Sequence, residues 1–134
     1  MHKSIVVFEV AGGSDKYFDG HRRDTMPIVN AIREAGWSAE VVYYRPEWKD
    51  DLYTYVSENF DGYISRVNPG NIPGGERGYF ELLTSLSVAG LVGMSTPGEI
   101  NCSCVGFTSE LDMGIQELVA QEAIKRVVEK FGDA

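Results

Sequence analysis

The sequence predicts an α/β domain in which helices cover both faces of a mostly parallel sheet of four or five strands. The length of 134 residues suits one domain. Strand-like and helix-like segments alternate over residues 4–94, and this order is typical of parallel strands joined by right-handed crossovers. The first strand-like segment, residues 4–10, is almost continuously apolar, as expected for a strand that is buried on both faces.

Local signals place each element of this alternation. The first helix is expected to begin at Asp24 or Thr25, either of which can cap it, and to end at Gly36. Pro27 fits its first turn. Apolar patterns predict the remaining elements, which are strands at 38–44, 63–67 and 91–94 and helices at about 50–59 and 79–89.

The alternation breaks after the fourth strand. Residues 95–99 alone separate it from a strand-like run at 100–107, whereas a parallel crossover needs about a dozen residues or more. The fifth strand is therefore expected to run antiparallel to the fourth or to lie elsewhere. A long amphipathic helix at 109–131 follows. We thus expect one compact domain, in which residues 98–134 pack as a strand and a helix on an α/β unit of residues 1–97.

Composition limits the partners of this chain. Acidic residues outnumber basic residues by 20 to 12, for a net charge of −8, which disfavours nucleic acids and anionic membranes as partners. No apolar run approaches the ~20 residues of a transmembrane helix, and residues 1–10 lack the features of a signal peptide. Cys102 and Cys104 are too close in sequence for an unstrained disulfide, so free thiols and a cytoplasmic location are expected.

A ligand site is expected at one edge of the sheet. Ligands of parallel α/β sheets bind at the carboxyl ends of the strands, and the two long loops, 11–23 and 68–78, follow strands at that edge. Arg66 lies near the end of the third strand, where its guanidinium is suited to a carboxylate or a phosphate. The alternative is a surface arginine that pairs with Asp61 or Glu76.

Two further groups are candidates for ligand contacts. His21, Arg22 and Arg23 precede a helix N-terminus, which itself favours anions; the alternative is an ordinary solvated charge run. Glu99 and Asn101 share one face of the last strand, where carboxylate and amide oxygens form part of a magnesium site. Plain polar–apolar alternation explains that pair equally well.

Four stretches of the sequence resemble the ATP-grasp ligases. Residues 64–69 (ISRVNP), a helix that carries Tyr79 and several leucines, and residues 90–97 (GLVGMSTP) resemble the N-terminal pre-ATP-grasp domain of glutathione synthetase-like enzymes. Residues 98–101 (GEIN) resemble the Glu-x-Asn signature near the end of those enzymes. The resemblance implies a Rossmann-like three-layer fold from which the central ATP-binding body, between residues 97 and 98, is missing.

The resemblance also implies roles for individual residues. It implies that a small acidic or peptide substrate contacts residues of both loops and of the following helix, namely His21, Arg22, Arg23, Arg66, Asn68 and Tyr79. It further implies that Glu99 and Asn101 hold magnesium and the phosphates of ATP. Because the nucleotide-binding body is absent, this chain alone is expected to bind neither magnesium nor ATP and to have no ligase activity.

Three functional hypotheses are open at this point. The first is a truncated ATP-grasp ligase-like protein that keeps the substrate-binding half of the enzyme. The second is one part of a working ATP-dependent carboxylate–amine ligase whose ATP-binding body is supplied elsewhere. The third is an unrelated flavodoxin-like domain that binds a small ligand or has a regulatory role. Apolar surface at the expected junction also makes a homodimer an expectation.

Overall fold

The computed structural model describes residues 2–10, 25–67, 75–95 and 113–132. Within them, four strands form one parallel sheet in the order β2-β1-β3-β4. The strands are β1 (Ser4–Val10), β2 (Ser38–Tyr44), β3 (Gly62–Ser65) and β4 (Val92–Ser95). The helices are α1 (Thr25–Glu34), the short 3₁₀ helix η1 (Pro46–Trp48), α2 (Lys49–Asn59), α3 (Glu76–Val88) and α5 (Met113–Phe131).

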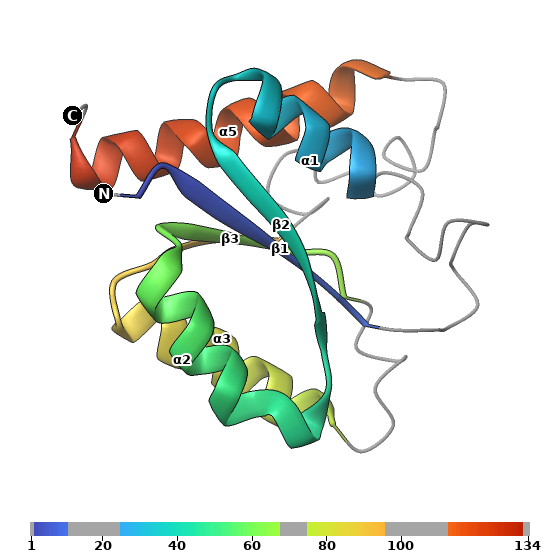
Figure 1. Ribbon diagram of the computed structural model, residues 1–134, viewed down its shortest axis with the longest axis vertical. Helices are drawn as coiled ribbons and strands as arrows, with labels where there is room; N and C mark the ends of the chain where they lie inside the picture. The colour runs from blue at the N-terminus through green and yellow to red at the C-terminus, as the bar shows by residue number, and fades with distance from the viewer. Residues whose placement is uncertain (1, 11–24, 68–74, 96–112, 133–134) are drawn as a thin grey trace.

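The elements form three layers, with the sheet in the middle (Figure 1). Helices α1 and α5 cover one face of the sheet, and α2 and α3 cover the other. This arrangement confirms the predicted α/β three-layer fold with its parallel sheet and its long C-terminal helix. The strand predicted at 100–107 and the junction near residue 97 lie outside the described residues.

The core is organised around β1, which is buried along its whole length. Ile5 and Val7 pack on the side of α1 and α5, whereas Val6, Phe8 and Val10 pack on the side of α2 and α3. Successive side chains of a strand point to opposite faces, so an apolar residue at almost every position lets one strand contribute to both halves of the core. This is the physical basis of the continuous apolar pattern in the sequence.

Helix α3 and strand β3 differ from the prediction at their ends. Helix α3 begins at Glu76 rather than at residue 79, and β3 ends at Ser65 rather than at residue 67. Gly78 suggested a loop, but it lies in the first turn of α3, at a position with no room for a side chain. A Cβ on Gly78 would lie 2.9 Å from the hydroxyl oxygen of Tyr44.

Two other glycines allow close packing around β3. A Cβ on Gly62 would lie 2.9 Å from Cγ2 of Val127 in α5 and 3.0 Å from the carbonyl oxygen of Val92. On the neighbouring strand, a Cβ on Gly93 would overlap the ring of Tyr63, its partner in the β3–β4 register. The Tyr63 ring therefore lies flat over Gly93, and its hydroxyl is 3.1 Å from the hydroxyl of Ser87.

The helices were compared with the length and hydropathy that a membrane-spanning helix requires. Among the residues that the structure describes, no helix combines the length and the apolar character that crossing a bilayer requires.

The packing of Tyr63 over Gly93 predicts the effect of a methyl group at this position. Gly93→Ala should lower the free energy of unfolding by about 1–3 kcal/mol, because the added Cβ displaces the buried ring. Urea unfolding measures this loss. In a Tyr63→Leu background the same change should cost less, since the shorter side chain leaves space for the methyl group. Equal costs in the two backgrounds would contradict the proposed clash.

Candidate functional site

The structure describes two of the eight predicted site residues, Arg66 and Tyr79. The other six lie outside the described residues; they are His21, Arg22, Arg23, Asn68, Glu99 and Asn101. Their predicted contacts with substrate or metal therefore stay predictions. The two that are described both lie at or beneath the carboxyl end of β3, where the sequence placed the ligand edge.

Arg66 is buried at the carboxyl edge of the sheet, directly after β3. Its residue exposure is 2%, and its backbone N–H donates to the carbonyl oxygen of Phe8 at 2.9 Å. The alternative of a surface arginine is therefore wrong. Asp61, one of the partners suggested for it, lies at the opposite end of β3, where its carboxylate accepts hydrogen bonds from the backbone N–H groups of His2 and Lys3.

A buried acidic residue occupies the adjacent register position on β1. The β1–β3 register pairs Phe8 with Ser65, so the next position along pairs Glu9 with Arg66. Glu9 is 0% exposed. Val7 and Ile64 pack on the face covered by α1 and α5. Residues two positions apart in a strand share a face, so Glu9 and Arg66 belong to the same face. A charged group is costly to bury unless it is paired or hydrogen-bonded, so both residues mark this edge as a built polar site.

The N-terminus of α1 lies at the same edge, because α1 follows the carboxyl end of β1. Its first residue, Thr25, is 0% exposed, and the hydroxyl Oγ1 has no hydrogen-bond partner within the described part of the chain. The N–H groups of a first helical turn have no partner within the helix, and the helix dipole places partial positive charge there. Thr25 thus adds a buried hydroxyl donor at a helix end that favours an anion.

The sequence analysis included Thr25 only as a possible cap and treated Glu9 as an ordinary strand residue. A signal for Glu9 was present, since it is the one acidic residue in an otherwise apolar run at residues 5–10. The missing hydroxyl partner of Thr25 had no such signal, because it depends on how α1 packs on the sheet.

Tyr79 lies in the core on the other face of the sheet. It is 1% exposed, and its ring packs edge-on against Phe8 and Tyr44, with centroid distances of 6.1 and 5.1 Å. Its hydroxyl forms a hydrogen bond with the hydroxyl of Ser65, the last residue of β3. Burial raises the pKa of the Tyr79 phenol well above its ordinary value. Tyr79 therefore packs against the end of β3 on the face of the sheet that α2 and α3 cover.

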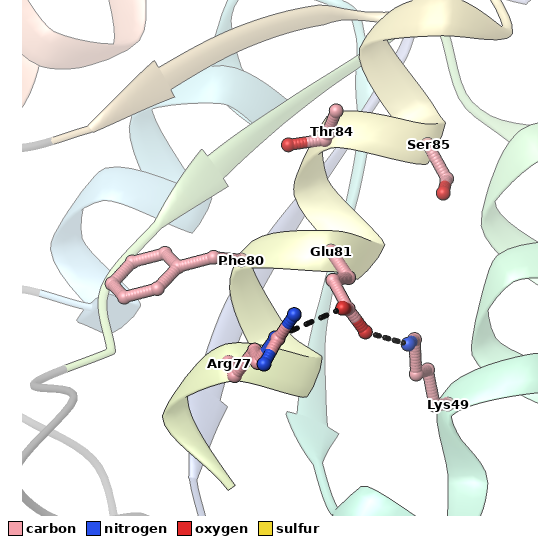
Figure 2. Close-up of a pocket in the computed structure, with 6 residues that line it drawn as sticks. All are labelled: Lys49, Arg77, Phe80, Glu81, Thr84 and Ser85. Atoms are coloured by element: carbon pink, nitrogen blue, oxygen red, sulfur yellow. Dashed lines mark hydrogen bonds and ion pairs between the residues drawn. The ribbon is translucent and has the colours of Figure 1, made fainter.

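A hollow lies on the outer surface, along α2 and α3. It has a volume of about 730 Å³ and is lined by Lys49, Arg77, Phe80, Glu81, Thr84 and Ser85. Figure 2 shows Lys49 of α2 and Arg77 of α3 both directed toward the carboxylate of Glu81. Lys49 Nζ is 2.6 Å from Glu81 Oε1, and Arg77 Nε is 3.4 Å from Glu81 Oε2. These contacts raise the pKa of Lys49 and lower the pKa of Glu81. The sequence analysis did not predict this hollow.

The described residues contain no metal-binding cluster. No group of three or more histidine, cysteine, aspartate or glutamate side chains is placed to hold an ion within those residues. The magnesium ligands predicted at Glu99 and Asn101 lie outside them.

Comparison with known proteins gives one structural likeness. No family model matches the chain, and no curated protein matches it. A diflavin flavoprotein A3 from Nostoc sp. is similar in structure, with a TM-score of 0.45 and 16% sequence identity. The match covers 96% of this chain and 98% of that chain.

These comparisons correct the expected resemblance to ATP-grasp ligases. No family model and no curated protein supports glutathione synthetase-like ligase ancestry, and the protein in the structural match is named a flavoprotein rather than a ligase. Magnesium and ATP were implied by that resemblance, so they are withdrawn with it. The physical reason is that the matched segments are short. A polar residue and a proline after a strand, or glycines before a turn, serve to end strands in parallel α/β sheets of many kinds.

The burial of Tyr79 predicts how stability changes in alkaline solution. The pKa of Tyr79 is raised in the folded state. Its contribution to the free energy of unfolding is therefore complete below the unfolded-state pKa of about 10, and it is lost as the pH rises above that value. Tyr79→Phe should lower stability at pH 7 by about 1 kcal/mol, through loss of the bond to Ser65. Above pH ~10 the parent protein should lose up to about 1.4 kcal/mol of stability per pH unit through Tyr79. Tyr79→Phe should not show this part of the loss, because phenylalanine does not ionise. Urea unfolding between neutral and alkaline pH measures both effects.

Ser65→Ala is the matched control for this prediction. It removes the same hydrogen bond but keeps the buried phenol. It should therefore lower stability at pH 7 and leave the alkaline loss in place. The assignment to Tyr79 fails if the two variants show the same alkaline slope.

Proposed function

We propose that this chain is a small-ligand-binding domain of flavodoxin-like topology that takes an anionic group, a phosphate or a carboxylate, at the carboxyl ends of β1 and β3. The observation that carries the proposal is the buried Thr25 hydroxyl. It has no hydrogen-bond partner within the described residues, and it lies in the first turn of α1, at the edge where Arg66 is buried.

The sheet order supports this location. The chain passes from β1 to β2 on one side, and then crosses over to β3 on the other side of β1. In open parallel sheets the crevice at such a reversal is the usual place for a ligand, and the order 2-1-3-4 is the flavodoxin-like one. Glu9 and Arg66 lie at the carboxyl ends of the two strands that flank this reversal.

The local charges favour an anion. The N-terminal end of α1 provides partial positive charge in a chain with a net charge of −8. The guanidinium of Arg66 adds donors suited to an anion, and the buried Glu9 at the adjacent register position balances its formal charge. A phosphate or carboxylate would accept hydrogen bonds from the Thr25 hydroxyl and from the first-turn N–H groups of α1. Burial strengthens these contacts because water does not compete for them.

A flavin phosphate is the natural first probe. Flavin mononucleotide binds at the β1/β3 reversal in sheets of this order, and riboflavin differs from it by the absence of the phosphate. The pair therefore isolates the contribution of the anionic group. We expect flavin mononucleotide to bind at least ~10-fold more tightly than riboflavin, which corresponds to about 1.4 kcal/mol.

Thr25→Val tests the hydroxyl with little change in side-chain volume. It should weaken binding of flavin mononucleotide by about 10-fold. At the same time it should leave the ligand-free protein equally stable, or more stable by about 1 kcal/mol, because a buried hydroxyl without a partner is unfavourable. Fluorescence titration and urea unfolding provide the two measurements. Thr54→Val, at an exposed position of α2, is the control.

Two results would contradict the proposed site. One is equal affinity for riboflavin and flavin mononucleotide, which would show that no phosphate contact exists. The other is a Thr25→Val protein that is clearly destabilised, because its hydroxyl would then have a partner in the ligand-free state.

A further inference from the structure

The hydroxyl of Tyr44 is a buried donor without an acceptor. Tyr44 is the last residue of β2 and is 2% exposed, and its hydroxyl has no hydrogen-bond partner within the part of the chain that the structure describes. Burial raises the pKa of this phenol, so it keeps its proton at neutral pH and is able to donate. Because buried polar groups are nearly always hydrogen-bonded, an orphaned hydroxyl points to an acceptor that is supplied from outside.

This hydroxyl lies against the first turn of α3. A Cβ on Gly78, the third residue of the helix, would be 2.9 Å from the hydroxyl oxygen. The N–H of Tyr79 donates to the carbonyl oxygen of Gly75 at 3.1 Å, so the helix itself offers no acceptor to the N–H groups of residues 76–78. Gly75, at the N-cap, provides no side-chain hydrogen bond. The phenol and the first-turn N–H groups therefore form one set of neighbouring donors.

The side chain of Lys49 forms the movable part of the cover over this hydroxyl. Its Cδ is 3.9 Å from the same Cβ position on Gly78, and Gly78 itself is only partly buried. Figure 2 shows the ammonium of Lys49 directed at Glu81, to which it bonds at 2.6 Å. The two side chains are 33% and 52% exposed, and an ion pair with this exposure contributes little to stability. Lys49 can therefore exchange Glu81 for another carboxylate at small cost.

The charges around the hydroxyl restrict the acceptor to one of low charge. Arg77 also contacts Glu81, at 3.4 Å, and it stays as a partner for Glu81 when Lys49 turns away. Glu47 and Asp50 are the other charged groups that act on this cluster. Two cations and three carboxylates give no excess of positive charge, so donors rather than net charge select the ligand. A carboxylate, with two acceptor oxygens and a single charge, fits these donors better than a phosphate dianion.

We propose that Tyr44, Lys49 and the first turn of α3 form a binding site for the carboxylate of a small organic acid. One carboxylate oxygen accepts a hydrogen bond from the Tyr44 hydroxyl, and the other accepts from a first-turn N–H group of α3. The ammonium of Lys49 turns from Glu81 to the ligand. This site uses neither Thr25 nor Arg66, so it does not rest on the proposed function.

Titration with acetate tests the proposal on the full chain. The backbone amide resonances of Arg77 and Gly78 should shift and saturate as sodium acetate replaces sodium chloride at constant ionic strength. Acetamide has the same shape, but it lacks the charge and the second acceptor oxygen, so it should bind at least ~10-fold more weakly. Heteronuclear NMR measures both affinities, because it detects weak binding residue by residue.

Two variants assign the site to its residues. Tyr44→Phe keeps the ring and removes the hydroxyl, so it should weaken acetate binding by about 5- to 10-fold. Gly78→Ala places a methyl group against the hydroxyl and should weaken binding at least as much. Tyr55→Phe removes the hydroxyl of an exposed tyrosine on α2 and is the matched control, with no effect expected.

Four results would overturn the proposal. The first is equal affinity for acetate and acetamide, and the second is equal affinity of the parent protein and Tyr44→Phe for acetate. The third is a Tyr44→Phe protein that unfolds at a clearly lower urea concentration than the parent, because its hydroxyl would then have a partner in the ligand-free state. The fourth is tighter binding of inorganic phosphate than of acetate at the same amides. Removal of an orphaned hydroxyl is not expected to prevent folding.

Discussion

The structure depends on the complete burial of β1. This strand pairs with β2 on one edge and with β3 on the other, and Ile5, Val6, Val7 and Phe8 are all 0% exposed. Burial of each such side chain stabilises the fold by about 1.5–3 kcal/mol. Because both faces of one strand are apolar, helices must cover both faces of the sheet, and the three-layer arrangement follows from this single constraint.

Because β1 is buried on both faces, the buried polar groups at the carboxyl ends of β1 and β3 stand out against an apolar core. Glu9 and Arg66 occupy positions that would continue the apolar rows of β1 and β3. Two apolar residues at these positions would be buried without the cost of taking charged groups out of water. Glu9, Arg66 and the buried hydroxyl of Thr25 are therefore polar exceptions at the edge of an apolar core, and the proposed ligand site rests on Thr25 among them.

Much of the fold could be predicted from the sequence, because strand and helix periodicities are local properties. The start of α3 could not, because a glycine in sequence favours a loop, whereas the reason for a glycine at position 78 is the close approach of the Tyr44 hydroxyl, a contact across 34 positions of sequence. The site was predicted in part. The position of Arg66 follows from the end of a strand, whereas its burial depends on packing. The hollow along α2 and α3 is lined by side chains from two separate helices, so no single stretch of sequence carries its signal. The short matches to ligase motifs do lie in single stretches of sequence, but they were misleading because they reflect turns that are common to many α/β sheets.

Core contacts run continuously from the proposed ligand edge to the hollow along α2 and α3. The hydroxyl of Ser65, next to Arg66, bonds to Tyr79; the ring of Tyr79 packs on Tyr44; and Tyr44 approaches Gly78, beside Lys49. Continuity alone does not make two sites communicate, because coupling requires an element with two alternative arrangements. These rings are closely packed and buried, and such a core resists gradual deformation. This core therefore holds the carboxyl end of β3 and the first turn of α3 in fixed relation.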